Sequence, residues 1–422
     1  MRTARVLLLA GAFFLSHCSD RSRDNPLDPL NPVTGGKPEP PALSSDRKTV
    51  FVRWTEMDNH SITGYRVWRR SPGEREPEPL ATVDRPSTVY TDTLPAYDTP
   101  FSYQVSALTP TFESPLSPPD SITAGPFNYW VADFFRGTVS VVTYDGAHLL
   151  REDYTDTPAA LAFDPSGTFL WVATYYPAMI VKRTLDGEEV FSHRLGSFPV
   201  DMAVNARTGS VWVVTSGESY VVRLDASTGA EEHVSTDMVL SRESRLDIDP
   251  SGDHVWVTVA DSDRVLKVGA RSPHKILPFS VGPFPRGVVT MADPAMAWVA
   301  TDSGVVGLDS AGGITRYLSR FSILDIDIHQ ELKQVWLVAY DTAARTTSVR
   351  RLKIWQGVWK GEEVALQGTY TLWKIRVNPG SDHPGLIVYD LAREQLVRLD
   401  GGGKPVGKRD GFSPRLDILV EE

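Results

Sequence analysis

The sequence predicts an all-β protein with two folded parts, an antiparallel sandwich and a closed ring of seven repeated sheets. Three observations lead to this prediction. Short runs that alternate apolar and polar residues recur about every ten residues between 38 and 124. No stretch within those residues has the period of an amphipathic helix. From residue 125 onward, an apolar strand that begins with tryptophan recurs about every 40 residues.

The composition excludes several classes of protein. The 422 residues include 43 Lys and Arg against 53 Asp and Glu, for a net charge of −10. Because binding to nucleic-acid backbones needs a basic surface, no nucleic-acid partner is expected. The hydrophobic content of 41% is that of an ordinary globular chain with a sizeable core. The single cysteine, Cys18, excludes a disulfide framework and a multi-cysteine metal site.

Residues 1–17 have the features of an export signal. Arg2 and Arg5 precede a ten-residue apolar run that is too short to span a bilayer. The following Leu-Ser-His-Cys at 15–18 resembles the bacterial lipobox, although His17 stands where that motif has a small residue. The resemblance implies a lipoprotein that is acylated at Cys18 and attached to a membrane. The alternative is an ordinary cleavage site beside an incidental cysteine.

Residues 18–37 are polar and rich in proline, which predicts an extended tether between the lipid and the folded parts. Ser19 stands after the cysteine, where an aspartate is associated with retention in the inner membrane of enterobacteria. The resemblance to lipoproteins therefore implies a place in the cell envelope at the outer membrane, facing the periplasm or the cell surface.

Residues 38–124 are expected to form the sandwich. Trp54 lies on the second alternating run, Tyr65 and Val67 on the third, and Leu94 precedes the run that contains Tyr103. This pattern resembles a fibronectin type III domain, in which the leucine and tyrosine form the tyrosine corner. The resemblance implies a rigid arm that holds the next domain away from the membrane.

The tryptophan strands are spaced by 41, 41, 44, 42, 38 and finally 50 residues, where a degenerate copy follows. A period near 40 residues of short strands indicates the blades of a β-propeller. We expect each tryptophan to pack between neighbouring blades. The strands begin at Trp130, Trp171, Trp212, Trp256, Trp298, Trp336 and Leu386.

An earlier strand precedes every tryptophan strand except the first, and a last such strand at 414–420 has no tryptophan strand after it. Pairing these two predicts a seven-bladed β-propeller over 125–422 that the C-terminal strand closes, which removes free sheet edges. The pattern resembles the NHL, YVTN and streptogramin-lyase-like propellers. It departs from WD40 repeats because the third strand ends in Leu-Asp instead of Trp-Asp.

The starts of the earlier strands are expected to line the mouth of a central channel. Aligning these strands on their final Asp or Asn places Arg245, Arg286, Lys374 and Arg415 at one position, and Asp247, Asp325, Arg376 and Asp417 two residues later. This predicts a site for an anionic ligand, such as an acidic glycan or a peptide or protein with carboxylates. The alternative is that Arg245, Asp247, Arg415 and Asp417 only neutralise one another in a wet channel.

Aromatic and acidic residues follow several of the tryptophan strands, and blade geometry places them on the face of the channel mouth. They include Phe134-Phe135, Tyr175-Tyr176, Asp302 and Tyr389-Asp390. Such a ring of side chains suits the stacking of sugars or peptide side chains, and it equally suits loops without a function.

Signals for catalysis are weak. The histidines of the mature chain lie outside the expected channel positions, so no histidine metal site and no cofactor are predicted. Asp247 and Asp249 begin a pattern similar to a calcium loop, but Thr258 stands at the twelfth position and a hairpin turn explains the pattern better. We therefore expect a non-catalytic binding or scaffolding module. The alternative is a propeller enzyme of the lyase or lactonase class with Asp247, Asp325 and Asp417 as metal ligands.

Overall fold

The computed structural model describes residues 23–309, 312–355, 358–380 and 385–421, so the export signal and Cys18 lie outside the described residues. The chain separates into two compact units. The first contains Val52–Tyr90 and Ser102–Asp120, and the second contains Ser121–Glu422 together with Leu43–Phe51 and Thr91–Phe101. In the described residues every regular element is a β-strand except the short 3-10 helix η1 (Ala260–Ser262). The all-β prediction is confirmed.

The strands before residue 124 form two sheets with the orders β1-β2-β5 and β4-β3-β6-β7. In β3, Tyr65 and Val67 are buried while Arg66 and Trp68 are partly exposed, which is the predicted alternation. The Tyr65 ring lies 5.5 Å from that of Trp54, and its hydroxyl accepts a hydrogen bond from the Met57 amide at 2.8 Å. The strands are β1 (Ala42–Asp46), β2 (Thr49–Arg53), β3 (Gly64–Arg70), β4 (Glu78–Asp84), β5 (Val89–Thr93), β6 (Pro100–Leu108) and β7 (Asp120–Thr123).

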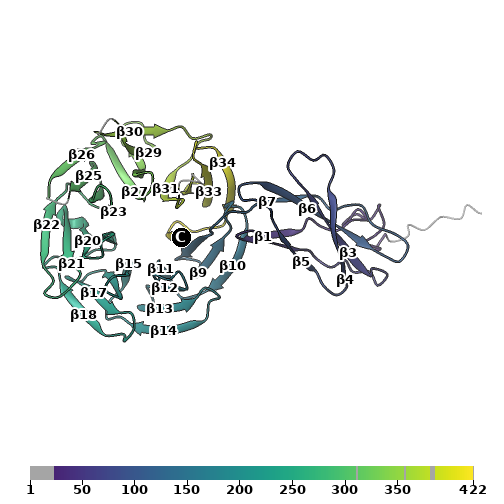
Figure 1. The fold of residues 1–422 in the computed structure, drawn as a ribbon, viewed down its shortest axis with the longest axis horizontal. Helices are drawn as coiled ribbons and strands as arrows, with labels where there is room; N and C mark the ends of the chain where they lie inside the picture. Colours follow the sequence, from purple (N-terminus) through teal and green to yellow (C-terminus); the bar gives the residue numbers. More distant parts are fainter. Residues whose placement is uncertain (1–22, 310–311, 356–357, 381–384, 422) are drawn as a thin grey trace, which may run out of the picture. The chain divides into compact units, whose positions relative to one another are not determined.

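The remaining strands form four-stranded sheets that lie side by side around a common centre (Figure 1). The first three sheets have the orders β10-β9-β8-β35, β11-β12-β13-β14 and β15-β16-β17-β18. Their strands are β8 (Tyr129–Asp133), β9 (Thr138–Val142), β10 (Leu149–Tyr154), β11 (Pro158–Phe163), β12 (Phe169–Thr174), β13 (Met179–Thr184), β14 (Glu189–Arg194), β15 (Pro199–Asn205), β16 (Ser210–Thr215), β17 (Tyr220–Asp225), β18 (Glu231–Ser235) and β35 (Leu416–Val420).

The next four sheets follow the chain without interruption, in the orders β19-β20-β21-β22, β23-β24-β25-β26, β27-β28-β29-β30 and β31-β32-β33-β34. Their strands are β19 (Leu246–Ile248), β20 (His254–Val259), β21 (Arg264–Gly269), β22 (Ile276–Ser280), β23 (Gly287–Met291), β24 (Met296–Thr301), β25 (Gly304–Asp309), β26 (Ile314–Tyr317), β27 (Phe321–His329), β28 (Gln334–Asp341), β29 (Thr346–Trp355), β30 (Val358–Val364), β31 (Leu372–Val377), β32 (Gly385–Asp390), β33 (Gln395–Asp400) and β34 (Pro405–Asp410).

The C-terminal strand completes the first sheet. β35 pairs antiparallel with β8, so that Asp417 lies opposite Ala132 and Leu419 opposite Trp130. The predicted pairing of the two ends of the repeat is therefore confirmed.

The tryptophans of the second strands are buried, with at most 4% of each exposed. Each belongs to a hydrophobic cluster that includes residues of the next sheet along the chain. Trp171, for example, packs with Val211 and Val222, and Trp336 packs with Ile375 and Val388. The predicted packing of tryptophan between sheets is confirmed, and burial of such large side chains is a main source of the stability of the ring.

Candidate functional site

A cavity of about 890 Å³ lies among the innermost strands β11, β15, β19, β23, β27, β31 and β35. All eight residues that the sequence placed at the channel mouth line this cavity. They are Arg245, Asp247, Arg286, Asp325, Lys374, Arg376, Arg415 and Asp417. The lining also contains Asp201 and Asp327, which are not among the eight predicted ligand-binding residues.

The strand register corrects the predicted alignment of these residues. Arg245 and Lys374 do share one level of the channel. Arg245 bonds to Thr258, two positions after Trp256, and Lys374 lies opposite Tyr389, two positions after Ile387. Ile387, and not the predicted Leu386, thus takes the place of tryptophan in the last sheet. Asp325 and Asp417 occupy that same level, whereas Arg415 lies two residues before Asp417 and directly precedes β35. The prediction that four basic residues share one position is wrong. β27 continues to His329 and its register shifts between Ile323 and Asp325, so its last aspartate is not a fixed reference point.

Arg286 also departs from the predicted position. Gly287 lies opposite Ala300, two positions after Trp298, and Arg286 precedes that level by one residue. The Arg286 guanidinium makes an ion pair with Asp302 and lies 5.0 Å from the ring centre of Phe284. Arg286 is thus already neutralised beside the cavity.

Aspartates on the inner strands bind backbone amides of the next inner strand. Asp417 Oδ2 accepts from the Leu161 amide at 3.0 Å, and Asp201 Oδ2 accepts from the Leu246 amide at 2.8 Å. The amides face the channel and have no further strand to pair with, so an unsatisfied donor would be costly there. The same bond joins Asp325 to Ile375, Asp247 to Thr290 and Asp327 to Val377, at 2.6–2.9 Å.

We call these aspartates, whose carboxylates accept from the amides of the next inner strand, the carboxylate caps. Their role explains why aspartates interrupt the apolar inner strands. They link neighbouring sheets by main-chain to side-chain hydrogen bonds, and charged acceptors make such bonds stronger than neutral ones. In the sequence, an aspartate at alternate positions of an apolar run predicts a channel-facing side chain, and this pattern pointed to Asp247, Asp325 and Asp417. The amides that donate to these carboxylates lie more than forty residues away in the chain and could not be predicted.

Arg376 is the centre of the charge network. Its Nη1 donates to Asp325 Oδ2 at 2.9 Å and its Nη2 to Asp417 Oδ1 at 3.2 Å, while Nε donates to the carbonyl of Ile418 at 2.8 Å. Burial alone would lower the pKa of Arg376, but Asp325 and Asp417 raise it above its usual range. The arginine therefore stays charged and joins β27, β31 and β35.

Lys374 lies beside this network and has fewer partners. Its Nζ is 3.8 Å from Asp325 Oδ1, a longer separation than a hydrogen bond. Burial lowers the pKa of Lys374, and Asp325 acts in the opposite direction. Lys374 thus contributes an ammonium group to the cavity that is only loosely paired.

Three aspartates of the channel hold protons more tightly than usual. Burial raises the pKa of Asp201 and of Asp327 to about 6, although Arg245 and Arg376 respectively oppose the shift. Burial raises the pKa of Asp247 to about 7, and the hydrogen bonds from Thr290 oppose this rise. The charged forms of these carboxyl groups are disfavoured because burial removes the water that would hydrate them.

We expect Asp247 to make the ring more stable as pH falls from about 7 toward 4. The folded state then binds a proton that the unfolded state, with its ordinary pKa of 3.8, does not yet bind. The contribution is at most about 1.4 kcal/mol per pH unit. Urea unfolding of wild type and Asp247→Asn across this range should show wild type gaining stability relative to the variant. Parallel pH profiles would contradict the assignment.

The mouth of the cavity contains Arg415 on an aromatic support. Its guanidinium lies 3.6 Å from the ring centre of Phe134 and 4.9 Å from that of Tyr175. Within the described residues, no hydrogen bond or ion pair engages the guanidinium nitrogens of Arg415. Burial lowers the pKa of Arg415 from its high ordinary value. A planar cation held on rings, with its N–H groups uncommitted, is prepared to bind a carboxylate in a bidentate manner.

Arg245 lines the same cavity as Arg415. Within the described residues, no ion pair joins the Arg245 guanidinium to a carboxylate within 4 Å. Its Nη1 donates to the carbonyls of Arg242 at 2.9 Å and of Ser244 at 2.8 Å, which hold the side chain in place without neutralising it. The alternative that Arg245 and Arg415 are neutralised by Asp247 and Asp417 is therefore wrong. Those two carboxylates bind Thr290, Leu161 and Arg376 instead.

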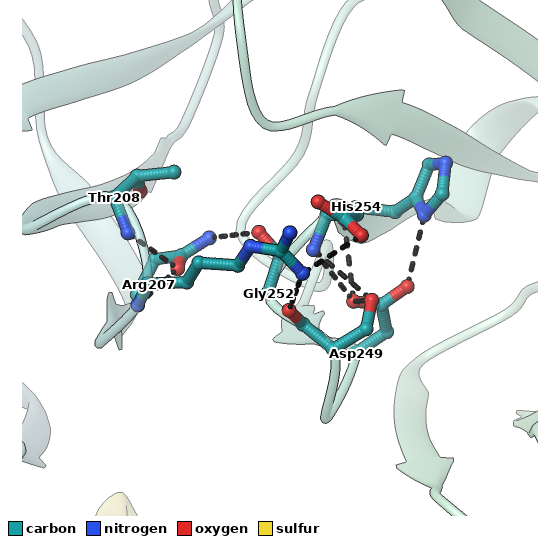
Figure 2. A network of polar contacts seen from close by, with 8 residues as sticks. Arg207, Thr208, Asp249, Gly252 and His254 are labelled. Atoms are coloured by element: carbon teal, nitrogen blue, oxygen red, sulfur yellow. Dashed lines mark hydrogen bonds and ion pairs between the residues drawn. The ribbon is translucent and has the colours of Figure 1, made fainter.

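The calcium-like pattern near Asp249 forms a hairpin turn. Asp249 Oδ1 accepts from the amides of Asp253 at 3.0 Å and His254 at 3.2 Å, and Oδ2 lies 2.9 Å from His254 Nδ1 (Figure 2). Both oxygens are thus used inside the turn, and Asp247 binds Thr290 on another strand. These contacts support the hairpin interpretation.

The same turn is tied to the preceding sheet. Asn205 Nδ2 donates to the Gly252 carbonyl at 2.9 Å, and Arg207 Nη1 binds the Ser251 carbonyl and Asp253 Oδ2, both at 3.0 Å (Figure 2). Equivalent turns of neighbouring sheets are therefore linked at this end of the inner strands.

Substitution of Gly252 by alanine is expected to cost about 2–4 kcal/mol of folding free energy, from backbone strain together with overpacking. Gly252 has φ of +69°, and a Cβ there would lie 2.6 Å from Arg207 Cβ. The matched control is Gly167→Ala in the equivalent turn, where φ is +66° and no atom lies within 4 Å of the new Cβ. The control carries only the backbone strain of roughly 1 kcal/mol. Equal losses in urea unfolding would show that the contact with Arg207 has no effect.

The carboxylates proposed as metal ligands do not converge. Arg376 lies between Asp325 and Asp417, and Asp247 faces Thr290. Over the described ranges, no group of three or more His, Cys, Asp or Glu side chains has the geometry of a metal site. The prediction that these three aspartates form a common ligand set is wrong. In the same part of the chain, no helix has the length and apolar character of a membrane span.

The repeated four-stranded antiparallel sheets are consistent with the β-propeller class of proteins. No protein-family model matches the sequence, and no curated protein matches it significantly. Among solved structures, a functionally unknown protein from Desulfotomaculum acetoxidans DSM 771 is similar with a TM-score of 0.56 and 13% identity, over 70% of this chain and 99% of that one.

Two further structures have similar scores. The periplasmic gluconolactonase of Pseudomonas aeruginosa has a TM-score of 0.54 and 14% identity, over 70% of this chain and 99% of that one. A putative 6-phosphogluconolactonase from Bacteroides fragilis NCTC 9343 has a TM-score of 0.55 and 14% identity, over 69% and 98% of the respective chains. Identities this low show a common fold and nothing further about this chain.

Proposed function

We propose that this chain is an exported lipoprotein whose propeller binds a carboxylate-bearing ligand at its channel mouth without transforming it. In this proposal a fibronectin type III arm precedes a seven-bladed β-propeller, and acylated Cys18 anchors the chain at the outer membrane. Burial of Leu94 and Tyr103 supports the arm, and the completion of the first sheet by β35 supports the blade count.

The observation that carries the binding function is the arrangement of Arg415 and Arg245. Arg415 lies on Phe134 and Tyr175 with its N–H groups uncommitted, and Arg245 is held by carbonyl groups alone. Two cations that are positioned by neutral groups leave their charge available to a ligand. Lys374 adds a loosely paired ammonium to the lining of the same cavity.

The binding proposal is tested on arrays of acidic glycans and acidic peptides, followed by calorimetry on the ligands that bind. We expect the double variant Arg245→Ala, Arg415→Ala to weaken binding by at least about 30-fold, because charge-assisted contacts are lost. Arg271→Ala, which removes one exposed charge elsewhere, is the control for net charge. Unchanged affinity in the double variant, or no ligand for wild type, contradicts the proposal.

The anchor is tested by the substitution Cys18→Ser. We expect the variant to leave the membrane fraction and to appear in the soluble fraction, because it lacks the acylated thiol. Wild-type fractionation of the variant would overturn the lipoprotein assignment.

A second candidate function is hydrolysis of a lactone, and Asp247 is the observation that favours it. A carboxyl group that lines a cavity and has a pKa of about 7 can take a proton from an attacking water near neutral pH. Release of acid from glucono-δ-lactone, measured for wild type and Asp247→Asn, separates the two functions. Hydrolysis at the uncatalysed rate would eliminate the enzyme.

A further inference from the structure

Four aromatic rings form a continuous row beside Arg415. We call Phe135, Phe134, Tyr175 and Phe198 the aromatic row, because their successive ring centres are 5.2, 5.5 and 4.7 Å apart. Phe134 and Phe135 follow β8, Tyr175 follows β12 and Phe198 precedes β15. The row therefore crosses the loops of three adjacent sheets.

The two ends of the row are open to solvent. Phe135 is 66% exposed and Phe198 is 41% exposed, while Phe134 and Tyr175 are partly buried between them. Exposed aromatic rings in a contiguous set are unusual on a soluble surface and mark binding surfaces. The mutual ring contacts hold the row in one arrangement, so little side-chain entropy would be lost on binding.

Arg415 makes the aromatic row chemically specific. Its guanidinium contacts Phe134 and Tyr175, which are the two middle members. A ligand that covers the row therefore meets apolar ring surfaces on both sides of a cation. Sugar rings offer an apolar C–H face for such stacking, and a uronic acid adds a carboxylate to the same unit.

We propose that the aromatic row and Arg415 bind an acidic polysaccharide, a chain of uronic acid units that spans several sheets. This inference rests on the proposed carboxylate-binding function and extends it by naming the ligand class. One unit places its carboxylate on Arg415 while neighbouring units stack toward Phe135 and Phe198. The affinity then grows with the length of the chain.

The channel itself favours a glycan over a peptide. A peptide that binds along a sheet edge needs free backbone amides. The inner-strand amides of Leu161, Leu246 and Ile375 already donate to the carboxylate caps Asp417, Asp201 and Asp325. The inner strands therefore offer side chains instead of an open edge at these positions.

The experiment measures binding of galacturonic acid and its oligomers up to the hexamer by calorimetry. We expect the hexamer to bind wild type at least about tenfold more tightly than the monomer. The variant Phe135→Ala, Phe198→Ala should lose most of this gain while it keeps the affinity for the monomer. Tyr154→Ala removes an aromatic ring that is 81% exposed on β10, outside the row, and is the matched control.

The outcomes separate the inference from the function on which it rests. Equal affinity for monomer and hexamer overturns the polysaccharide inference and leaves carboxylate binding standing. Binding of acidic peptides but of no galacturonate also overturns it. A hexamer that binds equally well after loss of Phe135 and Phe198 shows that the row is not the site. Absence of binding to every anion tested overturns the proposed function as well.

Discussion

Removal of residues 412–422 is expected to lower the stability of the ring by at least about 5 kcal/mol, a loss comparable with the total stability of many domains. β35 is the innermost strand of the first sheet, and Phe412, Leu416 and Ile418 are buried in the cluster that contains Tyr129. Each such side chain contributes on the order of 2–5 kcal/mol. The deletion also removes Asp417, and with it one partner of Arg376.

The measurement is urea and thermal unfolding followed by tryptophan fluorescence. Ile418→Ala tests the same strand with less disruption, and a loss of about 2–4 kcal/mol is expected because only 1% of the side chain is exposed. Val406→Ala on β34, where the side chain is 44% exposed, should cost less than about 0.5 kcal/mol. A truncated chain that melts like wild type would show that β35 does not close the ring.

Replacement of Asp325 by alanine is expected to lower the free energy of unfolding by about 3–5 kcal/mol, because it breaks a buried ion pair. Asp325 accepts hydrogen bonds from Arg376 and from the Ile375 amide and lies near Lys374. Its removal leaves an amide without a partner and two buried cations with one carboxylate fewer. The surface pair of Asp293 with Lys333 is the control, because an exposed ion pair contributes about 0–1 kcal/mol.

A double variant distinguishes two causes of this loss: the missing attraction between Asp325 and Arg376, and the buried charge of Arg376 that is left without a counter-charge. If the buried charge of Arg376 causes the loss, Arg376→Met in the Asp325→Ala background should cost much less than Arg376→Met alone. Additive losses would show that the two residues act independently. A loss for Asp325→Ala equal to that for Asp293→Ala would show that the network does not stabilise the ring.

The level of each side chain in the channel could be predicted only in part. Arg245, just before β19, and Lys374 on β31 share a level as expected, because each lies four residues before the Asp or Asn used for the alignment. Arg286 and Arg415 do not, since the starting residues of β23 and β35 and the register shift in β27 are not visible as a pattern of residue types. A slip of one residue reverses the face of a strand, so a small error in register changes the predicted site.

The contacts that define the candidate site join residues far apart in the chain. Arg415 lies on Phe134, which precedes it by almost the whole length of the ring, and Arg376 joins Asp325 to Asp417. The alternation of charged and apolar positions is enough to predict that these residues line the channel. Their pairing required the curvature of the ring, which brings its first and last strands together.

By itself, the sequence determined the local properties of this protein: strands at a period near 40 residues, tryptophans that pack between sheets, and a last strand without a partner in its own repeat. These follow from side-chain chemistry within a few residues. Only the tertiary structure decided which aspartates cap which amides, which arginines are neutralised and which remain available. The physical reason is that hydrogen bonds and ion pairs depend on separations of a few ångströms, and closure of the ring sets those separations between distant segments.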